Sequence, residues 1–131
     1  MINFDEYRDV FVVADTIDDV VHPVTYELIG QARHIAKELG QLVQVMLLGE
    51  NVQAEAEELV AHGADIVHVF ESPLLKYYTT DGYTKVLTDF FEDHTPNILL
   101  IGATNNGRDL APRMSGRMQN GVVADCTILT V

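Results

Sequence analysis

The chain has little positive charge, a single cysteine and no long apolar run. Eight Lys and Arg residues stand against twenty Asp and Glu residues, which gives a formal net charge of -12. Nucleic acids and anionic membranes are bound through basic surfaces, so this charge balance argues against both as partners. The one cysteine, Cys126, has no second cysteine for an internal disulfide, which favours a reducing compartment.

Segments that cross or target membranes are also missing. The longest unbroken apolar runs, Val10–Ala14 and Ile98–Ala103, are far shorter than the roughly 20 residues that span a bilayer. The start, Met1–Glu6, lacks the basic and apolar regions of a signal peptide. We therefore predict no membrane insertion and a cytoplasmic protein. With 131 residues, 47% of them hydrophobic, residues 1–131 should form one globular domain.

Several common chemical sites are absent from the sequence. The turn after Val10–Ala14 has no glycine, and Gly102–Gly107 is not followed by Lys and Ser or Thr, so neither a dinucleotide fingerprint nor a P-loop is present. The five histidines do not fall at metal-ligand spacing, and no nucleophile has a recognisable base. We therefore predict no catalytic residue and no metal site. A cation could bind Asp15, Asp18 and Asp19, but such a run is more typical of a solvated loop.

Apolar, β-branched runs alternate with helical patterns along the chain. Most of these runs are apolar on both faces, which is typical of central parallel strands with helices on both sides. The predicted strands are Val10–Ala14, Leu42–Leu48, Ile66–Phe70, Ile98–Ala103 and Val122–Val131. The predicted helices are Pro23–Leu39, Val52–His62, a third from Thr80 or Asp81 that ends before Pro96, and Gly107–Met118.

Local signals indicate how these helices begin and end. Pro23 fits a first helical position and Gly40 a left-handed stop. Asn51 is the predicted N-cap of the second helix. In the fourth helix, Pro112 is tolerated only within the first turn, so Asp109 is predicted to be its cap or a first-turn acid.

The element order predicts an α/β three-layer sandwich that is Rossmann-like or adenine-nucleotide-hydrolase-like. Its mainly parallel, five-stranded sheet should have the strand order 3-2-1-4-5. Ligands of such sheets bind beyond the carboxyl ends of the strands, where the strand order reverses. This rule places Asp15–Asp19 across a crevice from Thr104–Arg108.

The segment after the fourth predicted strand is the main candidate site. It is rich in arginine, and its helix start offers polar side chains and free backbone donors, which suit a phosphate, a flavin edge or an acidic partner. The alternative is a capped helix with a surface arginine. The candidate cofactor-binding residues are Thr104, Asn105, Asn106, Gly107 and Arg108.

A second candidate is the irregular connection from Glu71 to Thr80. Tyr77, Tyr78 and Tyr83 could stack on a ring or contact a partner, or they could pack this loop over the sheet edge. The sequence also stops at Val131, inside a strand-like apolar run, where an edge would be left uncovered. This abrupt end favours the front piece of a longer protein.

The stretch Gly102–Arg113, with Gly121 and Ala124–Thr127, resembles the signature segment of the electron transfer flavoprotein α subunit, in its N-terminal domain. Weaker similarities extend over nearly the whole chain: Pro23–Thr25, Glu27–Arg33, Gly63–Asp65 and Leu74–Thr84. After the first strand, Ala14-Asp15-Thr16 departs from the family's usual glutamate-containing pattern.

The resemblance implies an electron carrier subunit rather than a stand-alone enzyme. In this family the α subunit pairs with a β subunit, and the complex carries FAD and transfers electrons from acyl-CoA or other dehydrogenases to an acceptor. Some anaerobic relatives also bifurcate electrons from NADH. The family's principal FAD-binding domain follows this one and is absent from the chain. The present domain would then dock the β subunit and position the flavin domain, with Arg108 and its turn at the cofactor edge or subunit contact.

A rival hypothesis is a free-standing adenine-nucleotide-binding module of the same fold, similar to stress proteins. It would bind AMP or ATP between Asp15 and Thr104, but the glycine-spaced phosphate loop of those proteins is not seen here. An enzyme acting on small acids is a third possibility, which no acid–base pair supports.

Overall fold

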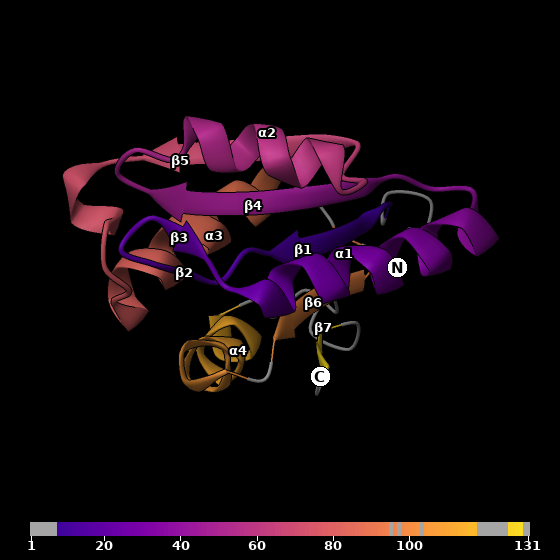
Figure 1. Ribbon diagram of the computed structural model, residues 1–131. Helices are drawn as coiled ribbons and strands as arrows, with labels where there is room; N and C mark the ends of the chain where they lie inside the picture. The colour runs from indigo at the N-terminus through magenta and orange to yellow at the C-terminus, as the bar shows by residue number, and fades with distance from the viewer. Residues whose placement is uncertain (1–7, 95, 97, 103, 118–125, 130–131) are drawn as a thin grey trace.

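The computed structural model describes residues 8–94, 96, 98–102, 104–117 and 126–129. Its elements follow one another as strands and crossover helices (Figure 1). In chain order they are β1 (Val10–Val13), β2 (Thr16–Ile17), β3 (Val20–Val21), α1 (Pro23–Leu39), β4 (Val43–Gly49), α2 (Gln53–Ala61), β5 (Ile66–Glu71), the 3-10 helix η2 (Pro73–Leu75), α3 (Thr80–Asp93), β6 (Ile98–Gly102), α4 (Asn105–Arg117) and β7 (Cys126–Leu129).

Five strands form one sheet in the order β5-β4-β1-β6-β7, and every neighbouring pair is parallel. The predicted fold and strand order are therefore confirmed. The two remaining strands, β2 and β3, form a separate antiparallel hairpin that the sequence did not predict.

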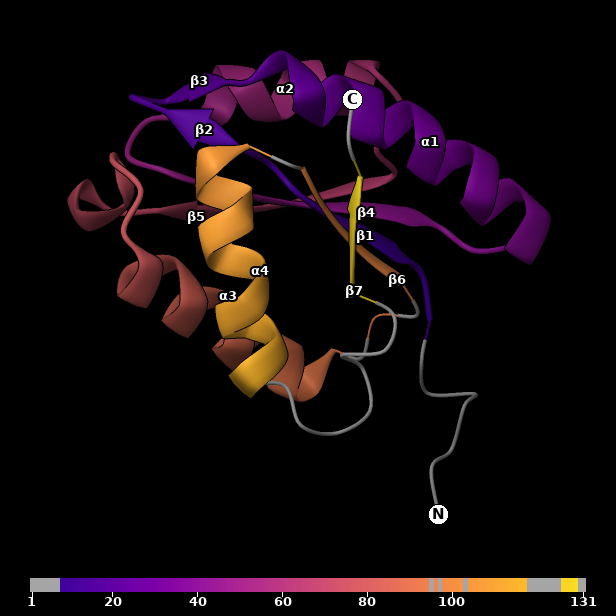
Figure 2. The ribbon, with the colours of Figure 1, turned by 90° about the horizontal axis from the view of Figure 1, so that it is seen from below.

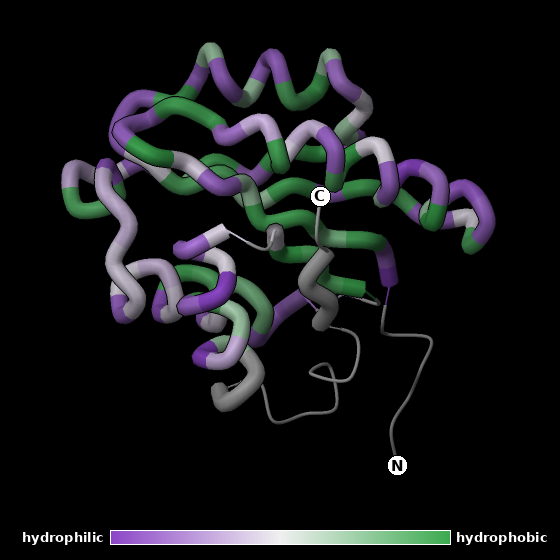
Figure 3. The backbone as a smooth tube through the Cα atoms, turned by 60° about the horizontal axis from the view of Figure 1, so that its bottom comes forward, coloured by the Kyte–Doolittle hydropathy of each residue, from purple (hydrophilic) through white to green (hydrophobic). Residues whose placement is uncertain are grey.

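Helices cover both faces of the sheet, α1 and α2 on one side and α3 and α4 on the other (Figure 2). Alternate residues of β1 serve the two sides: Val10 and Val12 join the first core, and Phe11 and Val13 join the second. All four are buried. Hydrophobic strands lie between helices with hydrophilic outer turns (Figure 3), as expected when parallel strands bury both faces.

The first core is completed by helix residues of α1 and α2, and the second by those of α3 and α4. The main helix contributors to the first are Leu28, Ile29 and Leu59. Those to the second are Leu87, Phe91, Leu110 and Met114.

The ends of α1 are those predicted. Pro23 occupies its first turn, and Gly40 follows it with a φ of 66°. The amide of Gly40 donates back to the last turn of the helix, which is the usual left-handed stop.

The prediction that Asn51 caps α2 is wrong. Val52 occupies the N-cap position and its side chain makes no capping bond. The amide of Asn51 instead donates to the Asp19 carboxylate at 3.1 Å, and the amide of Val52 donates to Glu71 at 3.0 Å. Carboxylates from the hairpin turn and from the end of β5 thus accept the two amides that lead into α2.

The hairpin lies where the sequence indicated only an acidic loop. Its turn residues, Asp18 and Asp19, have φ values of 51° and 62°. Two successive left-handed residues make the tight turn that joins antiparallel strands, and Asp tolerates this conformation better than most residues. Thr16 Oγ1 donates to the carbonyl of Leu48 at 2.9 Å, which fastens the hairpin to the end of β4.

Within the described part of the chain, no helix is both long enough and apolar enough to cross a membrane. The predicted helix end at Met118, Gly121 and both ends of the predicted last strand, 122–125 and 130–131, lie outside the described residues, as does Met1–Glu6. The burial of Cys126 stays a prediction.

The junction between β6 and α4 is tightly packed. A Cβ at Gly107 would clash directly with the backbone carbonyl oxygen of Gly102. We therefore expect Gly107→Ala to lower the free energy of unfolding by about 1–3 kcal/mol, because backbone must move to relieve the overlap. Urea denaturation measures this effect.

Gly30→Ala is the matched control for this substitution. Gly30 is an exposed residue of α1, and a Cβ there would meet nothing within 4 Å. Alanine should therefore raise stability by about 0.5–1 kcal/mol through its higher helix propensity. If the two substitutions changed the free energy of unfolding equally, the close contact between Gly107 and the Gly102 carbonyl would not limit the residue type at position 107.

Candidate functional site

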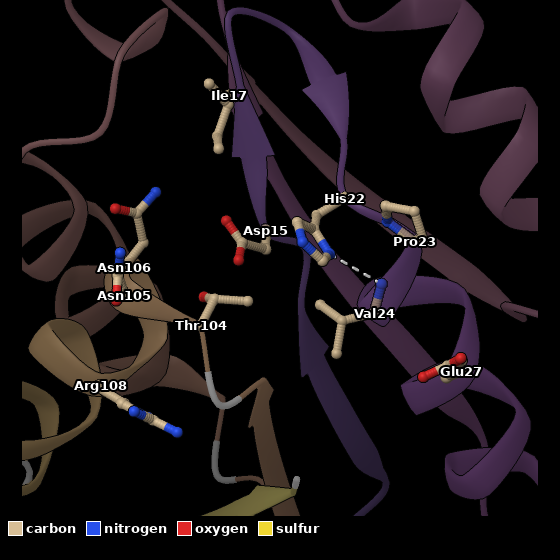
Figure 4. Close-up of a pocket in the computed structure, with 10 residues that line it drawn as sticks. All are labelled: Asp15, Ile17, His22, Pro23, Val24, Glu27, Thr104, Asn105, Asn106 and Arg108. Atoms are coloured by element: carbon tan, nitrogen blue, oxygen red, sulfur yellow. Dashed lines mark hydrogen bonds between the residues drawn. The ribbon is translucent and has the colours of Figure 1, made fainter. Parts of the chain in front are cut away.

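An open cleft of about 690 Å³ lies at the carboxyl edge of the sheet (Figure 4). It opens where the chain leaves β1 on one side and β6 on the other, which is the predicted position. One wall comes from the start of α4, and the opposite wall comes from the hairpin and the start of α1. The lining residues are Asp15, Ile17, His22, Pro23, Val24, Glu27, Thr104, Asn105, Asn106 and Arg108.

Thr104 shapes the α4 wall. Its Oγ1 accepts the amide of Gly107 at 3.0 Å, and its carbonyl accepts the amide of Arg108 at 2.8 Å. Thr104 therefore caps the helix, which begins at Asn105 rather than at Gly107. Asn105 is exposed and Asn106 is half-buried on the first turn.

The cap at Thr104 corrects two predictions about α4. Asp109 is the fifth residue of the helix, so it is neither the cap nor a first-turn acid. Pro112 lies inside the helix, where its ring removes one backbone donor.

Four of the five candidate site residues line the cleft, and the fifth does not. Gly107 is buried against β6 and lines a separate small cavity of about 20 Å³ behind the cleft. Its described role is close packing, while Thr104, Asn105, Asn106 and Arg108 face the space where a ligand or partner could lie.

Asp15 forms the opposite wall. Its amide donates to Thr25 Oγ1 at 3.0 Å, and its carbonyl accepts the amide of His22 at 2.7 Å. Its carboxyl group points across the cleft toward Thr104 and Asn106 (Figure 4). The Oδ2 atom is buried and has no hydrogen-bond partner among the described residues. A buried acceptor without a donor is costly, so this atom favours a ligand or partner that supplies an N–H or O–H group.

His22 has a structural role that the sequence did not indicate. Its Nδ1 accepts the amide of Val24 at 3.0 Å, so the ring caps α1. A neutral ring in this arrangement carries its proton on Nε2. Histidine is an uncommon N-cap, which is why the pattern around Pro23 revealed the helix start but not its cap.

The two walls differ in charge. Arg108 is exposed and makes no ion pair within the part of the chain that the structure describes. Asp15 and Glu27 lie on the other wall. A ligand that carries only phosphates would be repelled by the carboxylates of Asp15 and Glu27. A group with acceptors on one edge and donors on the other would match both walls.

Asp109 connects α4 to the start of α3. It accepts hydrogen bonds from Thr80 Oγ1 and from the Tyr78 hydroxyl, the latter at 2.7 Å, and Arg113 pairs with Asp81 in the same region. The pKa of Asp109 is lowered mainly by the hydrogen bond from Thr80, then by the hydrogen bond from Tyr78, and least by the positive charge of Arg113. Burial and the neighbouring carboxylate raise the pKa of Tyr78 to about 12.

The tyrosines are divided between two roles. Tyr78 contacts Asp109 and packs edge-on against Tyr83, with 5.0 Å between the ring centroids. Tyr83 is buried, and its hydroxyl lies 3.1 Å from Thr16 Oγ1. Tyr78 and Tyr83 thus hold the connection between β5 and α3, which contains η2, against the rest of the domain. Tyr77 is 61% exposed and can contact a partner.

The three acids considered as a cation site do not converge. Asp18 pairs with Lys76 at 3.6 Å, and Asp19 accepts the amides of Glu50 and Asn51. Across the described ranges, no group of three or more His, Cys, Asp or Glu residues is arranged to hold a metal ion.

Comparison with known proteins identifies close relatives. A family model described as "Electron transfer flavoprotein domain" matches residues 10–131. The electron transfer flavoprotein subunit alpha of Megasphaera elsdenii is 44% identical over 126 residues, which cover 96% of this chain and 37% of that protein. Subunit LctC of the lactate dehydrogenase (NAD(+),ferredoxin) of Acetobacterium woodii is 46% identical over 123 residues, 94% of this chain and 29% of that protein.

A third relative is the acryloyl-CoA reductase electron transfer subunit beta of Anaerotignum propionicum. It is 42% identical over 129 residues, 98% of this chain and 35% of that protein. The chain thus spans about a third of the length of these relatives.

The contacts of Asp109 predict a pH-dependent contribution to stability. Its folded-state pKa lies below the ordinary value of 3.8, so its stabilisation is present above the unfolded-state pKa and is lost as the pH falls through the folded-state pKa. Asp109→Asn should therefore lower the melting temperature at neutral pH, and the difference from the unsubstituted chain should shrink below about pH 4. Glu92→Gln, at an exposed position of α3, is the control. A difference for Asp109→Asn that does not change with pH would contradict this assignment.

Proposed function

The chain belongs to the electron transfer flavoprotein domain family, and we propose that it acts as the N-terminal domain of an α subunit in such a complex. In this role it docks the β subunit and holds the flavin domain in position. The complex carries electrons from acyl-CoA or other dehydrogenases to an acceptor, in the cytoplasm. The proposal extends to this chain what the names of its relatives state for those proteins.

The cleft at the carboxyl edge is the observation that carries this proposal. It combines the first turn of α4, Arg108, which pairs with no acidic residue that the structure describes, and a buried Asp15 oxygen that no described group reaches as a donor. This mixture of donors and acceptors matches a backbone segment of another subunit, or the amide-like edge of a flavin ring, better than it matches a phosphate chain.

FAD is the proposed cofactor of the whole complex. When bound, the flavin supplies the electron-transfer chemistry. Thr104, Asn105, Asn106 and Arg108 would hold its edge or the adjoining subunit contact, because their amides, side-chain amide groups and positive charge suit electron-rich oxygens. Gly107 would contribute only by allowing α4 to start so close to β6.

Co-expression tests the proposal. The natural gene product that carries this sequence should copurify with a β subunit as a heterodimer that shows flavin absorbance. A colourless product that does not bind the β subunit, but binds AMP tightly in calorimetry, would instead support the adenine-nucleotide-binding alternative. Omitting the β subunit is the control, and the flavin content should then fall.

Arg108→Ala tests the cleft within that complex. Loss of this cation, which lines the cleft, should weaken assembly about tenfold or shift the flavin reduction potential, while the melting temperature of the chain stays unchanged. Analytical ultracentrifugation and a redox titration measure the two effects. Lys37→Ala, an exposed cation near the far end of α1, is the matched control. A large loss of thermal stability in Arg108→Ala would show that the arginine is structural.

A further inference from the structure

The hairpin holds two large apolar side chains in solvent. Ile17 and Val20 are cross-strand partners, and they are 57% and 67% exposed. Single exposed apolar residues are ordinary, but a pair at the tip of a small hairpin is a surface of its own.

Several polar contacts keep this hairpin in place. Asp19 accepts the amides of Glu50 at 2.8 Å and Asn51 at 3.1 Å, and Thr16 bonds to the end of β4. The turn also keeps Asp18 and Asp19 in the left-handed conformation, which costs free energy for residues other than glycine. Contacts of this kind hold the exposed pair in one orientation, which lowers the entropy cost of binding a partner.

Two further exposed apolar side chains lie near the hairpin, one in η2 and one just after it. Leu74 is 83% exposed and Tyr77 is 61% exposed. Lys76 joins this segment to the hairpin, since its Nζ lies 3.6 Å from Asp18 and 5.8 Å from the centre of the Tyr77 ring. Figures 1 and 2 both show the η2 segment beside the end of the hairpin. We call the exposed side chains of Ile17, Val20, Leu74 and Tyr77 the apolar tip.

Negative charge surrounds the apolar tip. Asp18, Asp19 and Glu50 lie on the adjoining turns, and Glu71 ends β5. Lys76 is the one cation that the described contacts place among them. A partner with an apolar centre and a rim of Lys or Arg would complement this surface, and one with an acidic rim would be repelled.

We propose that the apolar tip is the centre of the contact surface for the β subunit, and that the matching surface of the β subunit is apolar with a basic rim. This inference rests on the proposed function for the identity of the partner. The tip is continuous with the cleft, because Ile17 belongs to both. One bound subunit would thus cover both features.

The test uses the natural gene product with its β subunit. In the double variant Ile17→Ser and Val20→Ser, the dissociation constant of the heterodimer should rise at least about tenfold, as for the loss of central interface residues. The matched control is Leu39→Ser with Val60→Ser, whose side chains are 46% and 51% exposed near the opposite edge of the sheet. This control should bind normally, and both variants should keep the melting temperature of the unsubstituted protein.

The basic rim proposed for the β subunit is tested separately, by the salt dependence of association. The association rate of the unsubstituted pair should fall as the salt concentration rises, and Glu50→Gln should reduce this dependence. A rate that does not depend on salt would overturn the partner chemistry stated here.

The possible failures are distinguishable. If the unsubstituted protein forms no heterodimer, the proposed function and this inference both fail. If it forms one that the tip variant forms equally well, only this inference fails. If instead the unsubstituted protein self-associates and the tip variant does not, the tip covers a second copy of the chain and the inference is overturned.

Discussion

The carboxyl edge of this molecule depends on the pairing of β1 with strands on both sides. β1 is hydrogen-bonded to β4 and to β6, and all four of its residues are buried. The chain leaves β1 toward α1 on one face of the sheet and leaves β6 toward α4 on the other (Figure 2). Two neighbouring connections that diverge in this way leave a gap between them, and the cleft follows directly from that topology. The side chains that line its walls come from the segments that follow the two strands.

Two acidic residues at this edge satisfy backbone donors. Asp19 accepts two amides before α2, and Glu71 accepts the amide of Val52 and the side chain of Gln53, which lowers the pKa of Glu71. These two carboxylates therefore have a structural role in the segments around α2. Asp15 is different, because one of its oxygens is buried without a donor among the described residues. The unpaired groups, rather than the acidic residues as a class, are those that favour an external partner.

Much of the fold could be predicted from the sequence, because the patterns that define it are local. The strands are largely apolar, and Pro23 with Gly40 delimits α1. The hairpin could not be predicted, since its turn is formed by Asp18 and Asp19 without the glycine that usually marks such turns. Proximity in sequence predicts Asn51 as a cap and Asp109 as a cap or first-turn acid. In the structure the amide of Asn51 donates to Asp19, and Asp109 accepts hydrogen bonds from Tyr78 and Thr80. Such contacts between distant segments are invisible to local rules. The position of the cleft was predictable from topology, but the close packing of Gly107 against β6 and the capping of α1 by His22 were not.

The shared position of Ile17 gives the cleft and the apolar tip a common physical consequence. Its side chain lines the cleft and is also more than half exposed at the tip. A partner that covers Ile17 removes water from one wall of the cleft, which lowers the local dielectric constant around Arg108 and Asp15. Electrostatic interactions strengthen in such surroundings, so a partner group paired with Arg108 would be held more tightly than on an open surface. A charge left without a partner in the covered cleft would cost free energy, because it would lose its hydration. Apolar contact at the tip would therefore strengthen charge matching in the cleft. A partner would need both features to bind tightly.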